Sequence, residues 1–171
     1  MDRQLHLSIA KELVEVVSPV SNPTSNDFIV HKPAWGLWTS TYDVDNNSSA
    51  WIEYRESTLF GGVPLTEFTW WLLTPRQDAR IYTIDSREKV SYLHKHYPLR
   101  LRRSQNNTRT IDFEAVSKDY DGLHLSWQGY QALSQTRLVG DWSCESTIWF
   151  HWCFSEVEQI APGIMMQEVL P

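Results

Sequence analysis

Apolar residues near the start of the chain recur at helical spacing. Over residues 3–17 the spaced positions are Leu5, Ile9, Ala10, Leu13, Val16 and Val17. Apolar residues three to four positions apart indicate an amphipathic helix. We therefore predict an N-terminal helix within residues 1–20. The shorter stretch 5–9 alternates apolar and polar residues, so a strand is the alternative there.

The segment from residue 28 to residue 41 has the pattern of a strand, a turn and a second strand. A short apolar run, Phe28-Ile29-Val30, is followed by His31, Lys32 and Pro33. Gly36 then precedes a second run, Leu37-Trp38, which ends in the hydroxyls of Thr39-Ser40-Thr41. Pro and Gly between two such runs are typical of a turn.

Further elements follow from the same kind of pattern. Residues 67–74 and 79–85 are rich in the apolar and β-branched residues of strands, and residues 123–127 begin another short apolar run. We expect helices at 50–56, with Ser48 or Ser49 as N-cap, after the capping-box-like residues 85–88, and after Asp112.

Residues 141–154 form the last strong apolar stretch, which we interpret as one strand. One face would carry Trp142, Cys144, Ser146, Ile148, Phe150, Trp152 and Phe154. The other, more polar face would carry Glu145, because side chains alternate across a strand. We interpret segments 28–41 and 141–150 as partners that face each other across a ligand cleft. The elements together predict an α+β fold with a strand-rich core and a few short helices.

Composition limits the class of protein. The chain has 171 residues, which suits one domain, 1–171, with a core over 28–171 after the N-terminal helix. A net charge of −6 argues against broad electrostatic binding of nucleic acid. For the basic run at Arg100, Arg102 and Arg103 we favour a solvated loop over a phosphate contact.

The sequence has no apolar run that suits a signal peptide or a membrane span, so we expect a soluble cytoplasmic protein, with export by a dedicated secretion machine as the alternative. Cys144 and Cys153 would lie about 30 Å apart on one strand, too far for a disulfide. We expect two free, buried thiols. No spacing of His, Cys, Asp or Glu suggests a metal site.

Glu145 is the sharpest chemical candidate. A carboxylate inside a Trp-rich strand is unfavourable unless it has a partner or faces a cleft, although a position on an exposed face is the simpler explanation. His31 or Lys32 could anchor a ligand after the first strand, Gly36 permits close backbone approach, and the hydroxyls of Thr39 and Ser40 could donate hydrogen bonds. Trp38 and Tyr54 could stack on a flat ring; for each, packing in the core or a loop position is the alternative.

These residues resemble the mono-ADP-ribosyltransferase family, in its diphtheria-toxin-like and PARP-like branch. The branch has a His at the end of its first strand, a Gly-aromatic-aromatic-Ser/Thr segment, a helix with Ala and Tyr, and a final strand with the catalytic Glu. Here the matching residues are His31, Gly36-Leu37-Trp38-Thr39-Ser40, Ala50 with Tyr54, and Glu145. Thr39-Ser40-Thr41 is also similar to the Ser-Thr-Ser segment of the arginine-specific branch, but Ser143 replaces the first Glu of that branch's Glu-x-Glu.

The resemblance implies a split, mainly antiparallel β-sheet and an NAD-dependent transfer of ADP-ribose through an oxocarbenium-like transition state. It implies that His31 or Lys32 anchors NAD, that Trp38 and Tyr54 sandwich the nicotinamide, and that Glu145 stabilises the sugar cation. NAD would be the substrate, with no metal. The acceptor would be a protein side chain, a nucleic-acid base, a small molecule, or water in a hydrolase. A toxin or effector role would further imply an antitoxin or immunity protein.

Two other functions stay open on the sequence. The Trp-rich β segments could form a non-enzymatic binding module for a carbohydrate or a protein partner, since nine Trp is a large excess. A different hydrolase could also use the His and Glu residues on this scaffold, because a catalytic triad need not be close in sequence.

Overall fold

The structure is a computed structural model. It describes residues 1–23, 32–57, 64–99, 110–133 and 142–162. His31 and the first apolar run at residues 28–30 therefore lie outside the described residues, as does the basic run at residues 100–103.

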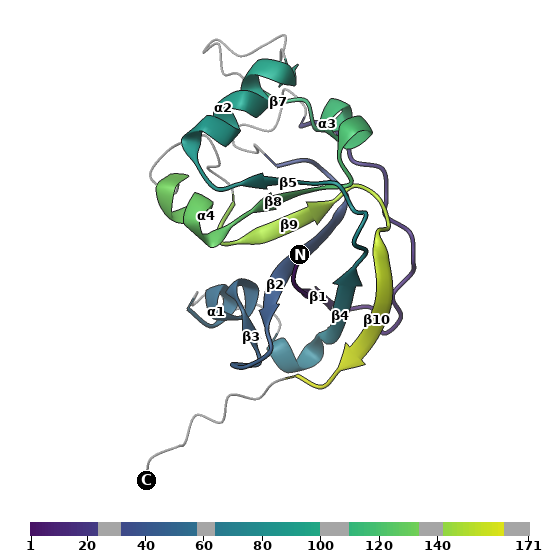
Figure 1. The fold of residues 1–171 in the computed structure, drawn as a ribbon. Helices are drawn as coiled ribbons and strands as arrows, with labels where there is room; N and C mark the ends of the chain where they lie inside the picture. Colours follow the sequence, from purple (N-terminus) through teal and green to yellow (C-terminus); the bar gives the residue numbers. More distant parts are fainter. Residues whose placement is uncertain (24–31, 58–63, 100–109, 134–141, 163–171) are drawn as a thin grey trace.

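The protein is a mixed α/β protein built on an open, mainly antiparallel sheet (Figure 1). The strand order is β10-β4-β1-β2-β9-β8-β5, with β3 paired to β2, and β5 runs parallel to β8. The strands of this sheet are β1 (Gln4–Ser8), β2 (Leu37–Asp43), β3 (Ser48–Ser49), β4 (Thr69–Pro75), β5 (Ile81–Ile84), β8 (Gly122–Leu125), β9 (Ser146–Trp149) and β10 (Phe154–Ile160). A small separate sheet pairs β6 (Pro98–Leu99) with β7 (Thr110–Ile111).

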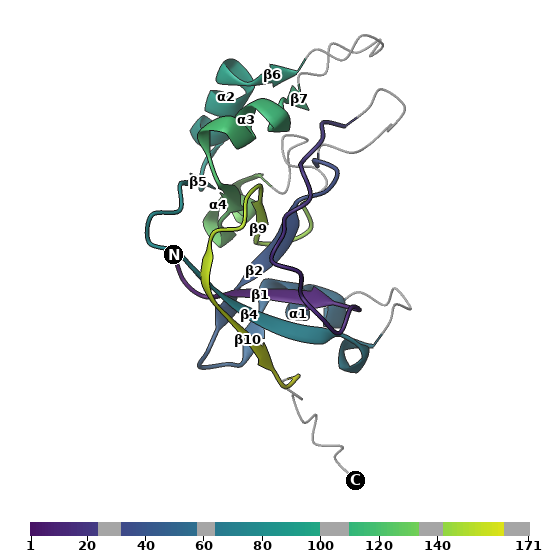
Figure 2. The ribbon, with the colours of Figure 1, turned by 90° about the vertical axis from the view of Figure 1, so that its right-hand side faces the viewer.

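The main sheet divides at β2. Residues Leu37 to Thr39 pair with β9, whereas Ser40 and Thr41 pair with β1 on the other edge of β2. One half-sheet is therefore β9-β8-β5, the other is β1-β4-β10, and β2 runs from one into the other (Figure 2). We call the stretch Thr39–Thr41 the β2 junction.

Short helices cover the outer faces of the two half-sheets. Helices α2 (Arg87–His96), α3 (Phe113–Asp119) and α4 (Trp127–Leu133) pack on β5 and β8, where Val90, Val116 and Leu133 join one core. Helix α1 (Ala50–Ser57) packs on the other half-sheet through Ile52, and a 3-10 turn spans Leu65–Glu67. None of the described helices is long and apolar enough to span a membrane.

A third core lies between the half-sheets. Leu73 of β4, Trp149 of β9 and Phe154 of β10 pack together there. The two half-sheets therefore contact each other through these apolar side chains.

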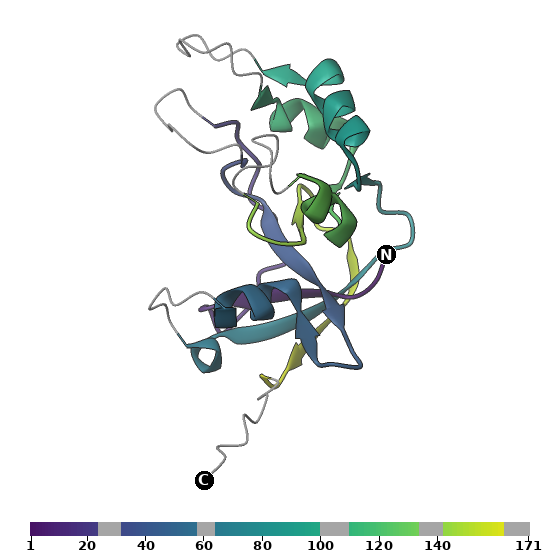
Figure 3. The same cartoon turned by 90° about the vertical axis from the view of Figure 1, so that its left-hand side faces the viewer.

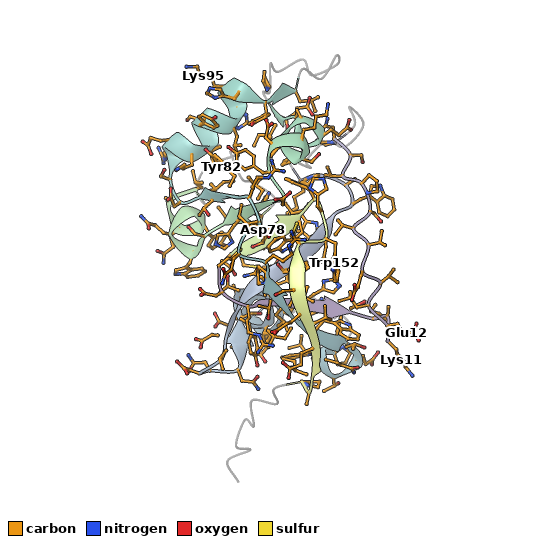
Figure 4. All side chains as sticks on the ribbon, turned by 45° about the vertical axis from the view of Figure 1, so that its right-hand side comes forward. Lys11, Glu12, Asp78, Tyr82, Lys95 and Trp152 are labelled. Carbon is orange, nitrogen blue, oxygen red and sulfur yellow. The ribbon has the colours of Figure 1, made fainter. Side chains whose placement is uncertain are left out.

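The predicted N-terminal helix is wrong. Residues 4–8 form β1, which pairs with both β2 and β4, so the alternating pattern applies and not the helical one. Leu5 and Leu7 are buried, whereas Ile9 and Val16 of the supposed helical face are mostly exposed. Lys11 and Glu12 project away from the sheet (Figure 4). As a central strand, β1 pairs on both edges and buries Leu5 and Leu7 in the core of its half-sheet.

Most of the other expected elements are confirmed. The structure has strands β4, β5 and β8 and helices α1, α2 and α3 at the expected places. Ser49 Oγ accepts from Ile52 N at 3.4 Å, and Asp112 caps α3 by accepting from Ala115 N at 2.9 Å. The capping box is wrong, because the N-cap of α2 is Ser86, which makes no side-chain cap bond.

The single strand over residues 141–154 is also wrong. The chain forms β9, leaves it at Phe150, and begins β10 at Phe154 in the other half-sheet. Phe150 N still donates to the Asp121 carbonyl at 2.8 Å, in register with the β8–β9 pairing, and the chain turns away after this bond. Cys144 and Cys153 therefore do not share a strand, and both are free, as expected. Cys153 is only half-buried.

Candidate functional site

Glu145 lies immediately before β9 and is buried. Glu145 is 6% exposed, so it does not lie on an exposed face of the strand, which was the simpler expectation from the sequence. Both faces of β9 are closed to solvent, since Ser146, Thr147, Ile148 and Trp149 are all buried. A buried carboxylate is unfavourable without hydrogen-bond donors, and the β2 junction provides them.

Ser40 and Thr41 hold the carboxylate of Glu145. Ser40 Oγ donates to Oε2 at 2.9 Å, and Thr41 Oγ1 donates to Oε1 at 2.8 Å. The backbone N–H of Thr41 lies 3.1 Å from Oε2 and 3.3 Å from Oε1. Two side-chain hydroxyls and one backbone amide therefore fix the carboxylate, and hydrogen bonds to an ionised group are stronger than neutral ones.

A chain of hydrogen bonds runs through the core to this carboxylate. The indole N–H of Trp149 donates to Thr39 Oγ1 at 2.9 Å, and Thr39 Oγ1 donates to Gln4 Oε1 at 2.8 Å. Gln4 Nε2 then lies 3.3 Å from Thr41 Oγ1, which donates to Glu145. Every donor in this chain points towards the carboxylate, an order in which each bond polarises the next.

His124 of β8 is a titratable neighbour of Glu145. Its Nδ1 lies 2.9 Å from Thr147 Oγ1 and 3.5 Å from Glu145 Oε1. The register explains the contact, because His124 pairs with Thr147, and Thr147 pairs with Thr39 of β2. Burial lowers the pKa of His124, while the nearby Glu145 carboxylate acts in the opposite direction. A neutral imidazole beside a carboxylate is thus expected near pH 7.

The two segments expected to face each other across a cleft are hydrogen-bonded neighbours. Leu37 pairs with Trp149 and Thr39 with Thr147, so no ligand fits between these strands. Gly36 permits this approach: its φ is +84°, and a Cβ there would lie 2.8 Å from Ile148 Cδ1. The close approach at Gly36 is thus to a strand of the same chain, and its role in a ligand site stays a prediction.

Trp38 packs edge-on against Trp142, with ring centroids 5.1 Å apart. The ammonium of Lys32 lies 5.4 Å from the centroid of the Trp38 ring. Trp38 pairs with Ile148 and packs against the same core, which lies under α2, α3 and α4. The Trp38 ring thus has structural contacts of its own, and the expectation that it stacks on nicotinamide stays a prediction.

Tyr54 lies on α1 and is 39% exposed. Helix α1 contributes Trp51 and Ile52 to the core of the other half-sheet, so Tyr54 and Trp38 come from elements that pack on different cores. Figure 3 shows α1 and α4 on the side of the molecule that faces its viewer. The structure brings together Ser40, Thr39 and Glu145 among the expected site residues, with Lys32 beside Trp38.

Cys144 precedes Glu145 but is no nucleophile. Burial raises the pKa of its thiol to about 12, with the Glu145 carboxylate adding to the shift. The thiol therefore stays protonated at neutral pH, and the thiolate is the reactive form. In the part of the chain that the structure describes, no three His, Cys, Asp or Glu side chains gather as a metal site.

Three members of this site were missed from the sequence: Gln4, His6 and His124. His6 Nδ1 donates to the Trp38 carbonyl at 2.8 Å, and burial lowers the pKa of His6. One signal was present, because Leu123-His124-Leu125 alternates and so places His124 opposite two core leucines. The same alternation was present at Leu5-His6-Leu7, but the helical interpretation of this segment was preferred; nothing local marks Gln4.

Comparisons of the chain with protein-family models, with curated proteins and with solved structures returned no match. A functional assignment for this chain therefore depends on what the buried carboxylate and its neighbours can do chemically.

Proposed function

We propose that the protein is an NAD-dependent ADP-ribosyltransferase in which Glu145 stabilises the positive charge of the ribose in the transition state. One observation carries the proposal: a buried carboxylate is fixed at the β2 junction by Ser40 and Thr41. The family resemblance in the sequence assigns the catalytic role to this same Glu, and the Thr39-Ser40-Thr41 segment supplies its donors.

The chemistry requires a group that favours a cation. The bond between the ribose C1 of NAD and the nicotinamide nitrogen breaks, and its electron pair leaves with nicotinamide. Positive charge then develops on C1 and the ring oxygen of the ribose. An ionised carboxylate held in place beforehand stabilises such charge, and it does so more strongly in a site closed to water than in bulk solvent.

The carboxylate has room for one more donor. Its two oxygens offer about four lone-pair sites, and the described hydrogen bonds come from three groups, namely Ser40 Oγ, Thr41 Oγ1 and Thr41 N. The fourth site suits a hydroxyl of the ribose, such as the 2′-hydroxyl, because His124 Nδ1, 3.5 Å from Oε1, is hydrogen-bonded to Thr147 Oγ1 and does not fill it. The Glu145 side chain is 8% exposed, so a ligand would reach it through a small opening.

A second histidine, His6, is a candidate for the His of the family pattern. The pattern has a His on the first strand, and the first strand of this protein is β1, which carries His6. Because Nδ1 of His6 donates to the Trp38 carbonyl, Nε2 is its acceptor atom when the ring is neutral. We propose that His6 takes the NAD-anchoring role first assigned to His31 or Lys32, and that Trp38 and Tyr54 keep their proposed contacts to nicotinamide.

The Trp-rich binding module is the weaker candidate. A carbohydrate-binding face needs exposed aromatic rings, but only two of the nine Trp are counted among the exposed large hydrophobic residues, Trp35 and Trp127. Trp70, Trp142 and Trp149 are buried. Most of the Trp excess therefore builds the cores of this fold.

The direct test is incubation of the purified protein with NAD while free nicotinamide is measured, first with water as the only acceptor and then with cell extract. Release of nicotinamide above that of a protein-free control supports the proposal. If no acceptor gives release and NAD does not raise the melting temperature, the transferase proposal fails. A glycan array run in parallel tests the binding module.

A further inference from the structure

His124 is a buried titratable group that the proposed role of Glu145 does not use. Its Nδ1 contacts Thr147 Oγ1 at 2.9 Å and Glu145 Oε1 at 3.5 Å, and its side chain is 15% exposed. In the described residues, its other ring nitrogen, Nε2, makes no hydrogen bond. One edge of the ring therefore contacts the carboxylate, and the opposite nitrogen is left for a ligand.

The surroundings decide where the ring proton lies. A carboxylate oxygen 3.5 Å from Nδ1 favours a proton on that nitrogen and disfavours a lone pair there. A proton on Nδ1 places the lone pair of the neutral ring on Nε2. Thr147 Oγ1 is the hydrogen-bond partner of Nδ1, and the Glu145 carboxylate behind it favours, through its charge, the tautomer in which Nε2 can act as a base.

Few charged groups act on His124. The two carboxylates that act on it are Glu145, next to β9, and Asp2, before β1, and both raise the pKa of the ring. Burial lowers this pKa and has the larger effect. On β5 the paired residue is Thr83, which is uncharged. A neutral ring that gains a carboxylate partner once protonated suits a group that accepts a proton during a reaction.

We infer that Nε2 of His124 is the general base of the transfer, and that the acceptor is therefore a hydroxyl group, with water as the simplest case. This inference rests on the proposed function. In the balanced step, the acceptor oxygen bonds to ribose C1 while the bond from C1 to the nicotinamide nitrogen breaks. Nicotinamide leaves with the electron pair, and the acceptor's proton passes to Nε2, giving an imidazolium beside the Glu145 carboxylate.

The test compares acceptors that have a proton to lose with one that does not. Wild type, His124→Gln and the control His151→Gln are incubated with NAD in water, in dilute methanol and in sodium azide, and each ADP-ribosyl product is measured. His151 is exposed and contacts Asp121 at the far end of β8. We expect His124→Gln to lose on the order of 10²-fold in the water and methanol reactions, the usual contribution of a general base. The azide reaction should persist, because azide carries no proton.

The outcomes separate the two proposals. If wild type releases no nicotinamide, the transferase proposal fails and this inference fails with it. If wild type is active but His124→Gln loses azide and water reactions equally, or loses neither, only the role of His124 is overturned. A melting temperature near that of wild type shows that the variant folds. If the variant does not fold, nitrogen NMR of wild type decides: a proton on Nδ1 supports the inference, and a proton on Nε2 overturns it.

Discussion

Ser40 Oγ donates a 2.9 Å hydrogen bond to the Glu145 carboxylate, although the two residues are 105 positions apart in the chain. The contact exists because β2 leaves β9 at the junction and joins β1, which leaves the end of β9 facing the hydroxyls of β2. Local helix or strand patterns do not encode such a contact. It depends on how the two half-sheets diverge.

Ser40→Ala tests whether this hydrogen bond orients the carboxylate. Loss of one donor to a buried charged group should lower the free energy of unfolding by about 1–3 kcal/mol. Nicotinamide release should fall about tenfold, as a loss of roughly 1.4 kcal/mol in the transition state would give. Ser155→Ala is the matched control, because its hydroxyl bonds the Thr74 carbonyl in an exposed position. Unchanged stability and turnover in Ser40→Ala would show that Ser40 does not hold Glu145.

Thr39→Val tests the buried chain of hydrogen bonds. The variant keeps the shape of the side chain but leaves the Trp149 indole N–H and Gln4 Oε1 without their partner. We expect a loss of about 2–4 kcal/mol in the free energy of unfolding, since two buried polar groups become unsatisfied. Urea unfolding followed by Trp fluorescence measures it, with Thr74→Val as control. A double-mutant cycle with Gln4→Leu should show coupling, and additive effects would argue against a connected chain.

Gly36→Ala tests the close packing of β2 on β9. An Ala at φ +84° is strained, and its Cβ would lie 2.8 Å from Ile148 Cδ1. We expect destabilisation of about 1–3 kcal/mol. Adding Ile148→Val removes Cδ1 and should restore the steric part of the loss but not the backbone part. A wild-type melting temperature for Gly36→Ala would contradict the geometry of the turn.

The stability of the protein should fall as the pH is lowered below neutral. Burial lowers the pKa of both His6 and His124 from the ordinary value of 6.5. The unfolded chain then binds more protons than the folded chain at mildly acidic pH, so the stabilisation is complete above pH 6.5 and is lost as the pH falls through the lowered pKa values. Melting temperatures from pH 7.5 to pH 5 measure the effect. A flatter profile is expected for His6→Gln, and a profile identical to wild type would remove His6 as a cause.

The sequence predicted the elements whose contacts are local. The helix after Asp112 follows from its N-cap, and β4 and β5 follow from their runs of apolar and β-branched residues. Residues 4–8 were misassigned because β1 is defined by its pairing with β2 and β4, and these partners are distant in the sequence. In this segment tertiary pairing outweighed the helical spacing of the apolar residues.

The candidate site was also predictable only in part, because single residues stand out in the sequence but their contacts across the sheet do not. Glu145 was identified because a carboxylate in an apolar segment is unusual, and Ser40 because hydroxyls end an apolar run. Their direct contact, and that of His124 with Glu145, depend on the order in which β2, β9 and β8 lie in the sheet. That order is set by packing across the whole domain, and no single segment specifies it.

The central claim is that the Glu145 carboxylate stabilises the cation formed when NAD loses nicotinamide. The most direct measurement is nicotinamide release by Glu145→Gln compared with wild type and with Glu88→Gln, a control at an exposed carboxylate of α2. The account predicts a loss on the order of 10²-fold or more in Glu145→Gln, the size expected when a preorganised charged group is removed, while Glu88→Gln keeps wild-type turnover. Full activity in a folded Glu145→Gln variant would contradict it.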